Sequence, residues 1–218
     1  MSLEIYPLEP ATPQTPVEQV RARCYEEVLS HFPVAENGVF RGVVRCEDLE
    51  NLKGDEPLSA VQYLWENIFI PDTYVDWTRL FSKFLSEETN VLPLIDRDMH
   101  YLGVYLLEDL LEELSEIKAF AEDGTVIRLE KPADDFKMSQ VAQVVEATGS
   151  KLLGILLVDE NYRNTVADVK VQSRDLNELL QTFRRYDFEI LSQHPEDRHL
   201  QELKENAEYL ERYLNMGK

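Results

Sequence analysis

His-Phe-Pro-Val-Ala-Glu-Asn-Gly-Val-Phe-Arg-Gly-Val-Val-Arg-Cys-Glu-Asp-Leu, residues 31–49, decides the fold because the same pattern returns later in the chain. Residues 91–110 read Val-Leu-Pro-Leu-Ile-Asp-Arg-Asp-Met-His-Tyr-Leu-Gly-Val-Tyr-Leu-Leu-Glu-Asp-Leu, with one extra residue in the turn. The matched pairs are Pro33 and Pro93, Gly42 and Gly103, Asp48 and Asp109, and Leu49 and Leu110. A duplication at this period predicts two copies of one supersecondary unit that bury their apolar faces against each other.

Each copy is expected to contain a β-hairpin. A short apolar run leads into a polar turn, at residues 36–38 and again at 96–98, and a second apolar run follows. Asn-Gly in the first turn is the stronger hairpin signal. The second strand then enters a short acidic helix headed by the matched aspartate. Because glycine has no side chain, Gly42 and Gly103 leave room for close approach by a neighbouring backbone or a ligand.

The Pro-Val or Pro-Leu strand, the turn and the Gly-x-x-x-x-x-Asp-Leu sequence resemble a pair of CBS domains. The resemblance covers the first 116 residues. It implies an α+β fold with two β-α-β-β-α repeats, at residues 1–54 and 55–117, which we call the first copy and the second copy. In CBS domain pairs, adenosine ligands bind in the cleft between the repeats, and the aspartate after the glycine accepts the ribose hydroxyls.

The resemblance implies a ligand site in that cleft for an adenosine nucleotide such as AMP or ATP. Its residues would be Gly42, Arg45, Asp48, Gly103 and Asp109. No catalytic residue and no other cofactor is implied.

This sequence departs from the CBS pattern three residues after each glycine, where the family has Ser or Thr. The first copy has Arg45 and the second has Leu106. Leu106 cannot hydrogen-bond, so we expect the second half-site to be impaired. Arg45 can bind a phosphate bidentately, or it can pair with Glu47 or another acid. Asp48 and Asp109 have a second interpretation, as N-caps of the helices that follow them.

Composition limits the classes of partner. The chain has 218 residues, enough for one large or two ordinary domains, and its net charge is −20, from 42 acids and 22 bases. Such an acidic chain is unsuited to nucleic acid and to anionic membrane surfaces. The longest apolar run, residues 152–158 with one glycine, is far shorter than the ~18 residues of a membrane span. With no secretory signal in the sequence, the predicted location is the cytoplasm.

The cysteines and histidines assemble no recognisable site. Cys24 and Cys46 match no disulfide framework, so we expect each to be a small core residue or an inert thiol. His31 and His100 flank the two hairpins and are expected to be edge residues. No second His or Cys pair completes a metal site around the other histidines, His194 and His199. The sequence also lacks a nucleophile elbow, a P-loop and a dinucleotide fingerprint, so we expect no enzyme and no metal.

An amphipathic helix should precede each hairpin. Residues 15–18, Thr-Pro-Val-Glu, predict a helix start with the hydroxyl of Thr15 as the cap. Val17, Val20, Cys24 and Val28 then follow with helical spacing. A second helix is expected from Asp76, with an apolar stripe made by Trp77, Leu80, Phe81, Phe84 and Leu85.

From Gly124 the pattern changes to a predicted βαββαβ order, the ferredoxin-like split unit. Strands are expected at 125–130, 152–158, 165–171 and 188–191, and the run 152–158 is expected to be a buried strand. The turn at 132–135 should cap the first helix, which Gly149 ends, and Ser173 should cap the second. This segment, residues 124–192, resembles an ACT domain, a class of amino-acid-binding regulatory module. Together the CBS pair and the ACT-like segment resemble acetoin-utilisation-type regulatory proteins.

Two features of the C-terminal half leave alternatives open. ACT domains often bind their amino acid at a glycine-containing turn after the first strand, and here that turn is Pro-Ala-Asp-Asp, so amino-acid binding does not carry over safely. A terminal helix at 195–216 shows a short heptad-like seam made by Leu200, Leu203, Ala207, Leu210 and Leu214. That helix either lies on its own domain or mediates self-association.

Together these features favour a cytoplasmic, non-catalytic regulatory or sensor protein that forms a homodimer. The ligand would be an adenosine-type nucleotide in the cleft, or an amino-acid-like metabolite in the ACT-like segment. The alternative is a protein–protein interaction scaffold whose ligand site has decayed. The substitutions Arg45 and Leu106, the turn at 132–135 and the heptad-like tail favour that alternative.

Overall fold

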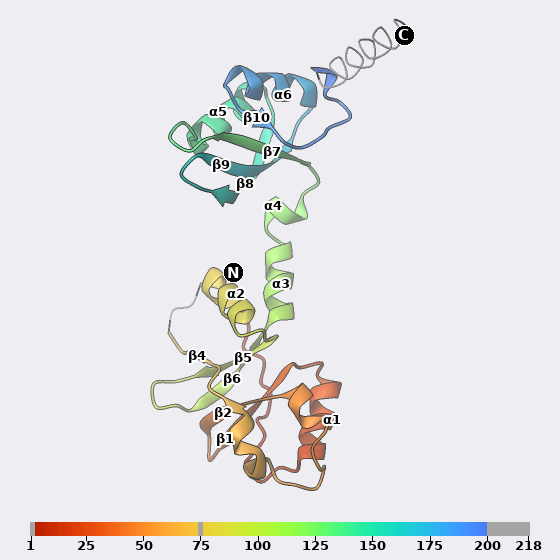
Figure 1. Cartoon of the computed structure of the whole chain (residues 1–218), viewed down its shortest axis with the longest axis vertical. Helices are drawn as coiled ribbons and strands as arrows, with labels where there is room; N and C mark the ends of the chain where they lie inside the picture. Colours follow the sequence, from red (N-terminus) through yellow and green to blue (C-terminus); the bar gives the residue numbers. More distant parts are fainter. Residues whose placement is uncertain (1–2, 74–75, 200–218) are drawn as a thin grey trace, which may run out of the picture. The chain divides into compact units, whose positions relative to one another are not determined.

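The structure is a computed structural model that describes residues 3–73 and 76–199 (Figure 1). It divides into two compact units, residues 1–116 and 117–218. The first unit contains both copies of the duplicated pattern, and the second begins shortly before the predicted ACT-like segment. The predicted terminal helix, residues 195–216, lies almost wholly outside the described residues.

In the first unit each copy has a helix followed by a hairpin and a short helical segment (Figure 1). The elements of the first copy are α1 (Val17–Glu26), β1 (His31–Glu36), β2 (Val39–Arg45) and the 3-10 helix η1 (Cys46–Leu49). Those of the second are η2 (Leu58–Leu64), β3 (Trp65–Glu66), β4 (Ile70–Pro71), α2 (Trp77–Ser86), β5 (Val91–Ile95), β6 (Tyr101–Leu106) and α3 (Leu107–Ser115). Both predicted hairpins are confirmed, since β1 pairs with β2 and β5 with β6, each antiparallel.

The two copies complete each other's sheets. Tyr6 bridges antiparallel to Val104 of β6, in the second copy, whereas Ala11 bridges parallel to Val34 of β1, in the first. The segment between the hairpins repeats this crossing: β3 pairs antiparallel with β2, and β4 then pairs parallel with β5. Each hairpin therefore receives one edge from each of the two crossing segments.

The matched glycines make this crossing sterically feasible. A Cβ on Gly42 would lie 3.0 Å from the carbonyl oxygen of Glu66, and one on Gly103 would lie 2.9 Å from that of Tyr6. Their φ angles, +150° and +141°, are also ones that side-chain-bearing residues rarely adopt. The room expected beside the glycines is thus filled by the backbone of the neighbouring segment.

The apolar cores of the unit are also shared between copies. One core is built mainly from the first copy but includes Val91 and Val104, and the other is built mainly from the second copy but includes Phe40 and Val43. This confirms that the duplicated units bury their apolar faces against each other.

The two amphipathic helices differ in how they match expectation. α2 begins as predicted, because the Asp76 carboxylate accepts a hydrogen bond from the Arg79 backbone N–H at 3.0 Å. The predicted cap at Thr15 is wrong: the hydroxyl of Thr15 instead accepts from the backbone N–H of Thr12, and Pro16 precedes the helix. Val28 lies beyond the end of α1 with a positive φ of 54° and is exposed, so it does not continue the buried stripe.

The second unit has the βαββαβ order expected from the sequence. After the short helix α4 (Lys118–Ala121) it runs β7 (Thr125–Pro132), α5 (Met138–Ala147), β8 (Lys151–Glu160), β9 (Asn164–Gln172), α6 (Leu176–Arg185) and β10 (Glu189–Ile190). The sheet order is β10-β7-β9-β8, and every neighbouring pair is antiparallel. Its core is made by side chains of α5 and α6 with alternate residues of β7 and β9.

Three expectations for this unit are wrong in detail. The run 152–158 is not a buried strand: it lies in β8 at the edge of the sheet, and Leu156, Leu157 and Val158 are exposed. α6 is capped by the Asp175 carboxylate, which accepts from the Glu178 N–H at 2.9 Å, and not by Ser173. The turn at 132–135 gives no side-chain cap to α5, whose N-cap is Lys137. The expected end of α5 is confirmed: this helix ends before Gly149, which has a positive φ of 68°.

None of the helices among residues 3–73 and 76–199 combines the length and the apolar character that crossing a bilayer requires.

Candidate functional site

A cavity of about 490 Å³ lies in the first unit, where the first copy meets the beginning of the second hairpin. This volume is in the range of pockets that hold small molecules. Side chains of α1, of the loop before β1 and of the end of β2 form most of its lining, which also includes two residues from the loop before β5. The lining residues are Arg21, Cys24, Tyr25, Val28, Leu29, Ser30, His31, Arg45, Cys46, Glu47, Glu50, Glu88 and Asn90.

The α1 wall of the cavity is fastened to the segment after β2 by Arg21. Its guanidinium donates to the carbonyl oxygens of Leu49 and Leu52, both at 2.9 Å, and to the carboxylate of Glu18 at 2.7 Å. These bonds leave the arginine only about a quarter exposed. Arg21 is therefore a structural tie as well as a positive charge at the cavity.

The same two walls are joined by a disulfide between Cys24 of α1 and Cys46 of η1, with their Cα atoms 6.1 Å apart. The expectation of two unpaired cysteines is wrong. The spacing of 22 residues carried no signal, because the pairing depends on how α1 packs over the end of β2. Cys24 is buried and Cys46 is half-buried, and both line the cavity.

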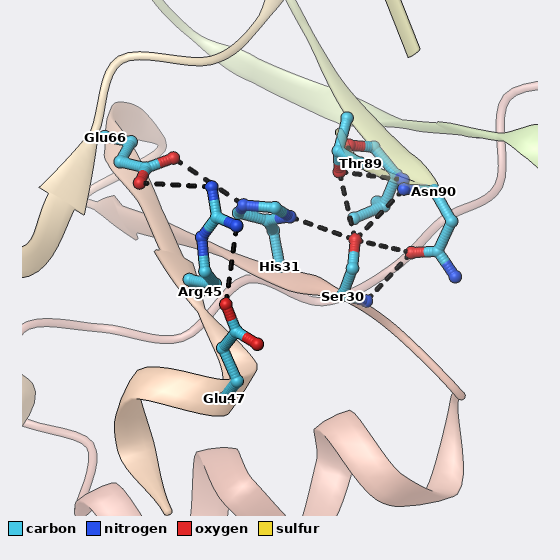
Figure 2. Close-up of polar contacts among 8 residues, drawn as sticks. Ser30, His31, Arg45, Glu47, Glu66, Thr89 and Asn90 are labelled. Atoms are coloured by element: carbon cyan, nitrogen blue, oxygen red, sulfur yellow. Dashed lines mark hydrogen bonds and ion pairs between the residues drawn. The ribbon is translucent and has the colours of Figure 1, made fainter. Parts of the chain in front are cut away.

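His31 and Arg45 form a polar cluster with Glu66 at one side of the cavity (Figure 2). Arg45 lies 3.4 Å from a carboxylate oxygen of Glu47 and 3.7 Å from one of Glu66, so the acid pairing considered from the sequence is present. His31 Nε2 lies 3.6 Å from the other Glu66 oxygen, beyond hydrogen-bond distance. Burial, followed by the positive charge of Arg45, lowers the pKa of His31. Both effects favour the neutral form of the His31 imidazole beside the guanidinium.

The prediction that His31 is an edge residue is wrong, because only 1% of it is exposed. It begins β1, and its Nδ1 lies 2.9 Å from the hydroxyl of Ser30. His100, by contrast, is exposed, and its ring contacts the Asp96 carboxylate in the second turn.

Ser30 and Asn90, at matched positions of the two copies, hold the loops at the cavity together (Figure 2). The Asn90 side-chain oxygen accepts from the Ser30 N–H at 2.8 Å and from its hydroxyl at 2.9 Å. In return, Ser30 Oγ accepts from the Asn90 N–H at 3.0 Å, and Asn90 Nδ2 donates to the carbonyl of Val28 at 2.8 Å. The Ser30 hydroxyl thus helps to hold the loop before β1 to the loop before β5.

Of the five residues expected in a ligand site, Arg45 alone lines this cavity. Asp48 is exposed and absent from the lining, although Glu47 and Glu50 on either side of it take part. Gly42 and Gly103 face backbone of the crossing segments. Asp109 lies in the first turn of α3.

The interpretation of the two aspartates as N-caps is wrong. Arg45 precedes η1 and Leu106 precedes α3, and neither helix start has a side-chain cap. Asp48 and Asp109 lie inside these elements and not at their caps.

The second copy shows what the first would be without its polar cluster. The position of His31 is taken by Val91 and that of Arg45 by Leu106, and the two apolar residues face each other across β5 and β6. Leu106 packs against the first apolar core. The impairment of the second half-site as a ligand site stays a prediction.

Sequence reasoning missed Ser30, His31, Glu66 and Asn90 as members of the site. A signal for two of them was present in the duplication. His31 is polar where the second copy has Val91, and Ser30 matches a second polar residue, Asn90, immediately before the strand. Glu66 had no such signal, because it reaches the cluster only through the pairing of β3 with β2.

The charges of the cavity are mixed. Arg21 and Arg45 supply two positive charges, whereas the exposed Glu47, Glu50 and Glu88 supply three negative ones. A guanidinium in this position can bind phosphate through two parallel hydrogen bonds, and carboxylates can accept from hydroxyls or amines. The cavity is chemically suited to a small molecule that carries both an anionic and a hydrogen-bond-donating part.

One group of potential metal ligands exists among the described residues, Asp96, Asp98 and His100 in the second hairpin turn. Its geometry is explained by the turn itself. The Asp96 carboxylate accepts from the backbone N–H groups of Asp98 and His100, both at 2.8 Å.

Comparisons with known proteins give structural likenesses without a family assignment. No protein-family model and no curated protein matches the chain. A CBS domain pair/ACT domain protein from Thermotoga maritima is 25% identical, with a TM-score of 0.44, and the match covers 52% of this chain and 93% of that one. CBSX2 in complex with AMP is 18% identical, with a TM-score of 0.43, over 52% of this chain and 94% of that one.

A third similar structure is the CBS domain of the bacterial CNNM/CorC family Mg2+ transporter in complex with ATP. It is 21% identical, with a TM-score of 0.40, over 50% of this chain and 82% of that one. The first of these structures is thus described as a CBS domain pair with an ACT domain, and the third as a CBS domain. Each likeness is weak, and none assigns a ligand to this chain.

Proposed function

We propose that the chain is a non-catalytic regulatory module that binds an adenosine-type nucleotide in the cavity of the first unit. The observation that carries the proposal is the placement of Arg45 at a cavity of about 490 Å³, between α1 and the loops that join the two copies. Phosphate would bind the guanidinium of Arg45 and replace its long contacts with Glu47 and Glu66.

The proposal includes one ligand per chain. In the second copy, the pair Val91 and Leu106 offers no hydrogen-bonding group where the first has His31 and Arg45. A ligand that needs a charge-assisted hydrogen bond therefore favours the first copy. Regulation would follow if the ligand binds one arrangement of the chain more tightly than another, since only a difference in affinity can shift a population.

The direct test is isothermal titration of the full chain with AMP, ADP, ATP and S-adenosylmethionine. We expect binding of an adenosine compound with a stoichiometry of one, lost in Arg45→Ala and kept in Asp109→Ala. Titration of Asp48→Ala then decides the role implied for that residue by the CBS resemblance: a loss of affinity would support a ribose contact. Absence of binding by every compound in the unaltered chain would contradict the proposed ligand class.

A second candidate function, an interaction scaffold, is favoured by β8. This strand pairs with β9 on one side and lies at the edge of its sheet, and Leu156, Leu157 and Val158 are 51%, 45% and 48% exposed. Exposed apolar edge strands promote pairing with another chain. We propose that the partner is a second copy of this chain, as in the homodimer expected from the sequence.

Sedimentation velocity tests the homodimer. We expect a dimer for the unaltered chain and a shift toward monomer in Leu157→Lys, since a charge on an edge strand opposes pairing. The variant Val126→Lys, on β7 inside the same sheet, is the control, because Val126 is also exposed at 46%. A monomer in the unaltered chain would exclude this interface.

A further inference from the structure

The two copies differ in how the helix is held to the segment that follows the hairpin. The first copy has a disulfide there, and the second copy holds the corresponding segments together without one. Cys24 of α1 corresponds to Phe84 of α2, and Cys46 after β2 corresponds to Leu107 after β6. Phe84 is buried, and Leu107 packs against the same core. In the second copy, apolar packing holds the helix to the segment after the hairpin without a covalent bond. The covalent bond in the first copy is therefore not required by the fold.

The location of the added bond is the cavity itself. Cys24 and Cys46 both line it, and Cys46 directly follows Arg45 in the chain. The bond joins the last part of α1, which contributes Tyr25 to the wall and leads into Val28, to the segment that contributes Arg45, Glu47 and Glu50. No corresponding covalent joint exists among the described residues of the second copy.

We infer that the Cys24–Cys46 disulfide is a redox-controlled clamp on the ligand cavity, so that its reduction weakens nucleotide binding. This inference rests on the proposed function of the cavity. While the bond is present, the wall and the arginine segment are held in one arrangement before the ligand arrives. Reduction frees the two segments, and binding must then order them at a cost in conformational entropy.

The chemistry is a thiol–disulfide exchange with a dithiol reductant. A thiolate of the reductant attacks the sulfur of Cys46, the half-buried member of the pair, and Cys24 leaves as a thiolate and takes up a proton. The second thiol of the reductant then attacks the mixed disulfide, which releases Cys46 as a thiol and leaves the reductant as a disulfide. Two electrons pass from the reductant to the protein.

Other contacts keep the reduced state folded. Arg21, one turn before Cys24, still binds the carbonyls of Leu49 and Leu52 after reduction. Val17 and Val20 still anchor α1 in the first core. Reduction is therefore expected to loosen the end of α1 and the 45–50 segment without releasing the whole helix. In a reducing compartment such as the cytoplasm predicted from the sequence, disulfides are characteristically transient or redox-sensing.

The test compares the full chain before and after treatment with dithiothreitol, with the thiol content measured by a colorimetric thiol reagent. We expect no free thiol before treatment and two after it. By titration, the dissociation constant for AMP or ATP should rise by about five-fold on reduction, the effect of immobilising roughly one more side chain. The double variant Cys24→Ser/Cys46→Ser should bind like the reduced protein and be indifferent to dithiothreitol.

A second readout does not need a nucleotide. Amide hydrogen exchange of residues 24–29 and 45–50 should become faster on reduction, while the matched residues 84–89 and 106–111 of the second copy should be unchanged. Equal nucleotide affinity in both redox states would overturn the clamp and leave the proposed function intact. If no nucleotide binds in either state, the proposed function fails, and unchanged exchange at 45–50 would then overturn the clamp independently.

Discussion

His31 lies opposite Arg45 across the antiparallel pair of β1 and β2, and the corresponding pair in the second copy is Val91 and Leu106. One fold therefore contains both a polar and an apolar version of the same cross-strand pair. The apolar version shows that the hairpin does not need the charge. The polar version places a guanidinium at a cavity, which is the basis of the first prediction.

Arg45→Leu should abolish the stabilisation of the chain by an adenosine nucleotide. A ligand at 100 times its dissociation constant adds about 2.7 kcal/mol to the free energy of unfolding, which thermal melting detects readily. The variant removes the phosphate contact but installs the residue that the second copy already tolerates. Arg41→Leu is the control, since it makes the same change in charge at an exposed arginine paired with Glu36. A full nucleotide shift in Arg45→Leu would show that the ligand binds elsewhere.

Acid should destabilise the first unit through His31. Its pKa is lowered in the folded chain, mainly by burial, so the unfolded chain binds the proton more tightly. The stabilising contribution is therefore complete above the unfolded pKa of about 6.5 and is lost as the pH falls through that value toward the folded pKa. Urea unfolding between pH 8 and pH 5 measures the effect.

The variant His31→Val introduces the residue found at the matched position of the second copy. It should reduce the loss of unfolding free energy between pH 8 and pH 5. His194 also has a pKa lowered by burial, so a decline from the second unit should persist in the variant. If the free energy of unfolding of His31→Val keeps the same pH dependence as that of the unaltered chain, then His31 binds its proton equally well in the folded and unfolded states.

Gly42→Ala and Gly103→Ala should each lower the free energy of unfolding by on the order of 1–3 kcal/mol. Both residues have positive φ angles and lie against backbone carbonyls, so the added methyl group meets atoms that move only if the sheet moves. Gly38→Asn is the control, because Gly38 has open space around its Cα at φ +80° and asparagine tolerates the left-handed region. Urea unfolding curves give the loss of unfolding free energy for each of the three variants. Equal losses would show that backbone strain at a positive φ matters more than the close approach of the carbonyl oxygens.

Reduction should also lower the thermal stability of the first unit. Closing a loop between residues 22 apart constrains the unfolded chain by about 3 kcal/mol in the chain-entropy model. For a unit of this size, the melting temperature should fall by on the order of 10 °C on addition of dithiothreitol. Cys24→Ser/Cys46→Ser should melt at the lower temperature with or without the reductant. A melting temperature that does not respond to the reductant would indicate that the native chain contains free thiols.

The sequence predicted the elements well where the signal was local and repeated. The Asn37-Gly38 turn, the start of α2 after Asp76 and the end of α5 before Gly149 depend on neighbouring residues only, and the structure confirms them. The matched glycines marked a close approach correctly, because only a residue without a Cβ fits there.

The failures have a common physical origin in long-range packing. The apolar run at 152–158 has the composition of a buried strand, but whether β8 is central or at an edge depends on the order of strands in space. Cys24 and Cys46 meet only because α1 covers the end of β2. Likewise, His31 lies near Glu66 only because β3 of the other copy pairs with β2. Of the candidate site, sequence reasoning therefore identified Arg45 but not its neighbours.

The crossing segments around Tyr6 and around β3 and β4 mean that the two copies must be encoded together to fold. Each hairpin borrows an edge from the stretch that precedes the other, so neither copy carries a whole sheet in its own contiguous sequence. A gene fragment encoding one copy would lack a strand that the other fragment encodes. The two halves can diverge in residue, as His31 and Val91 have, yet they must be passed on together.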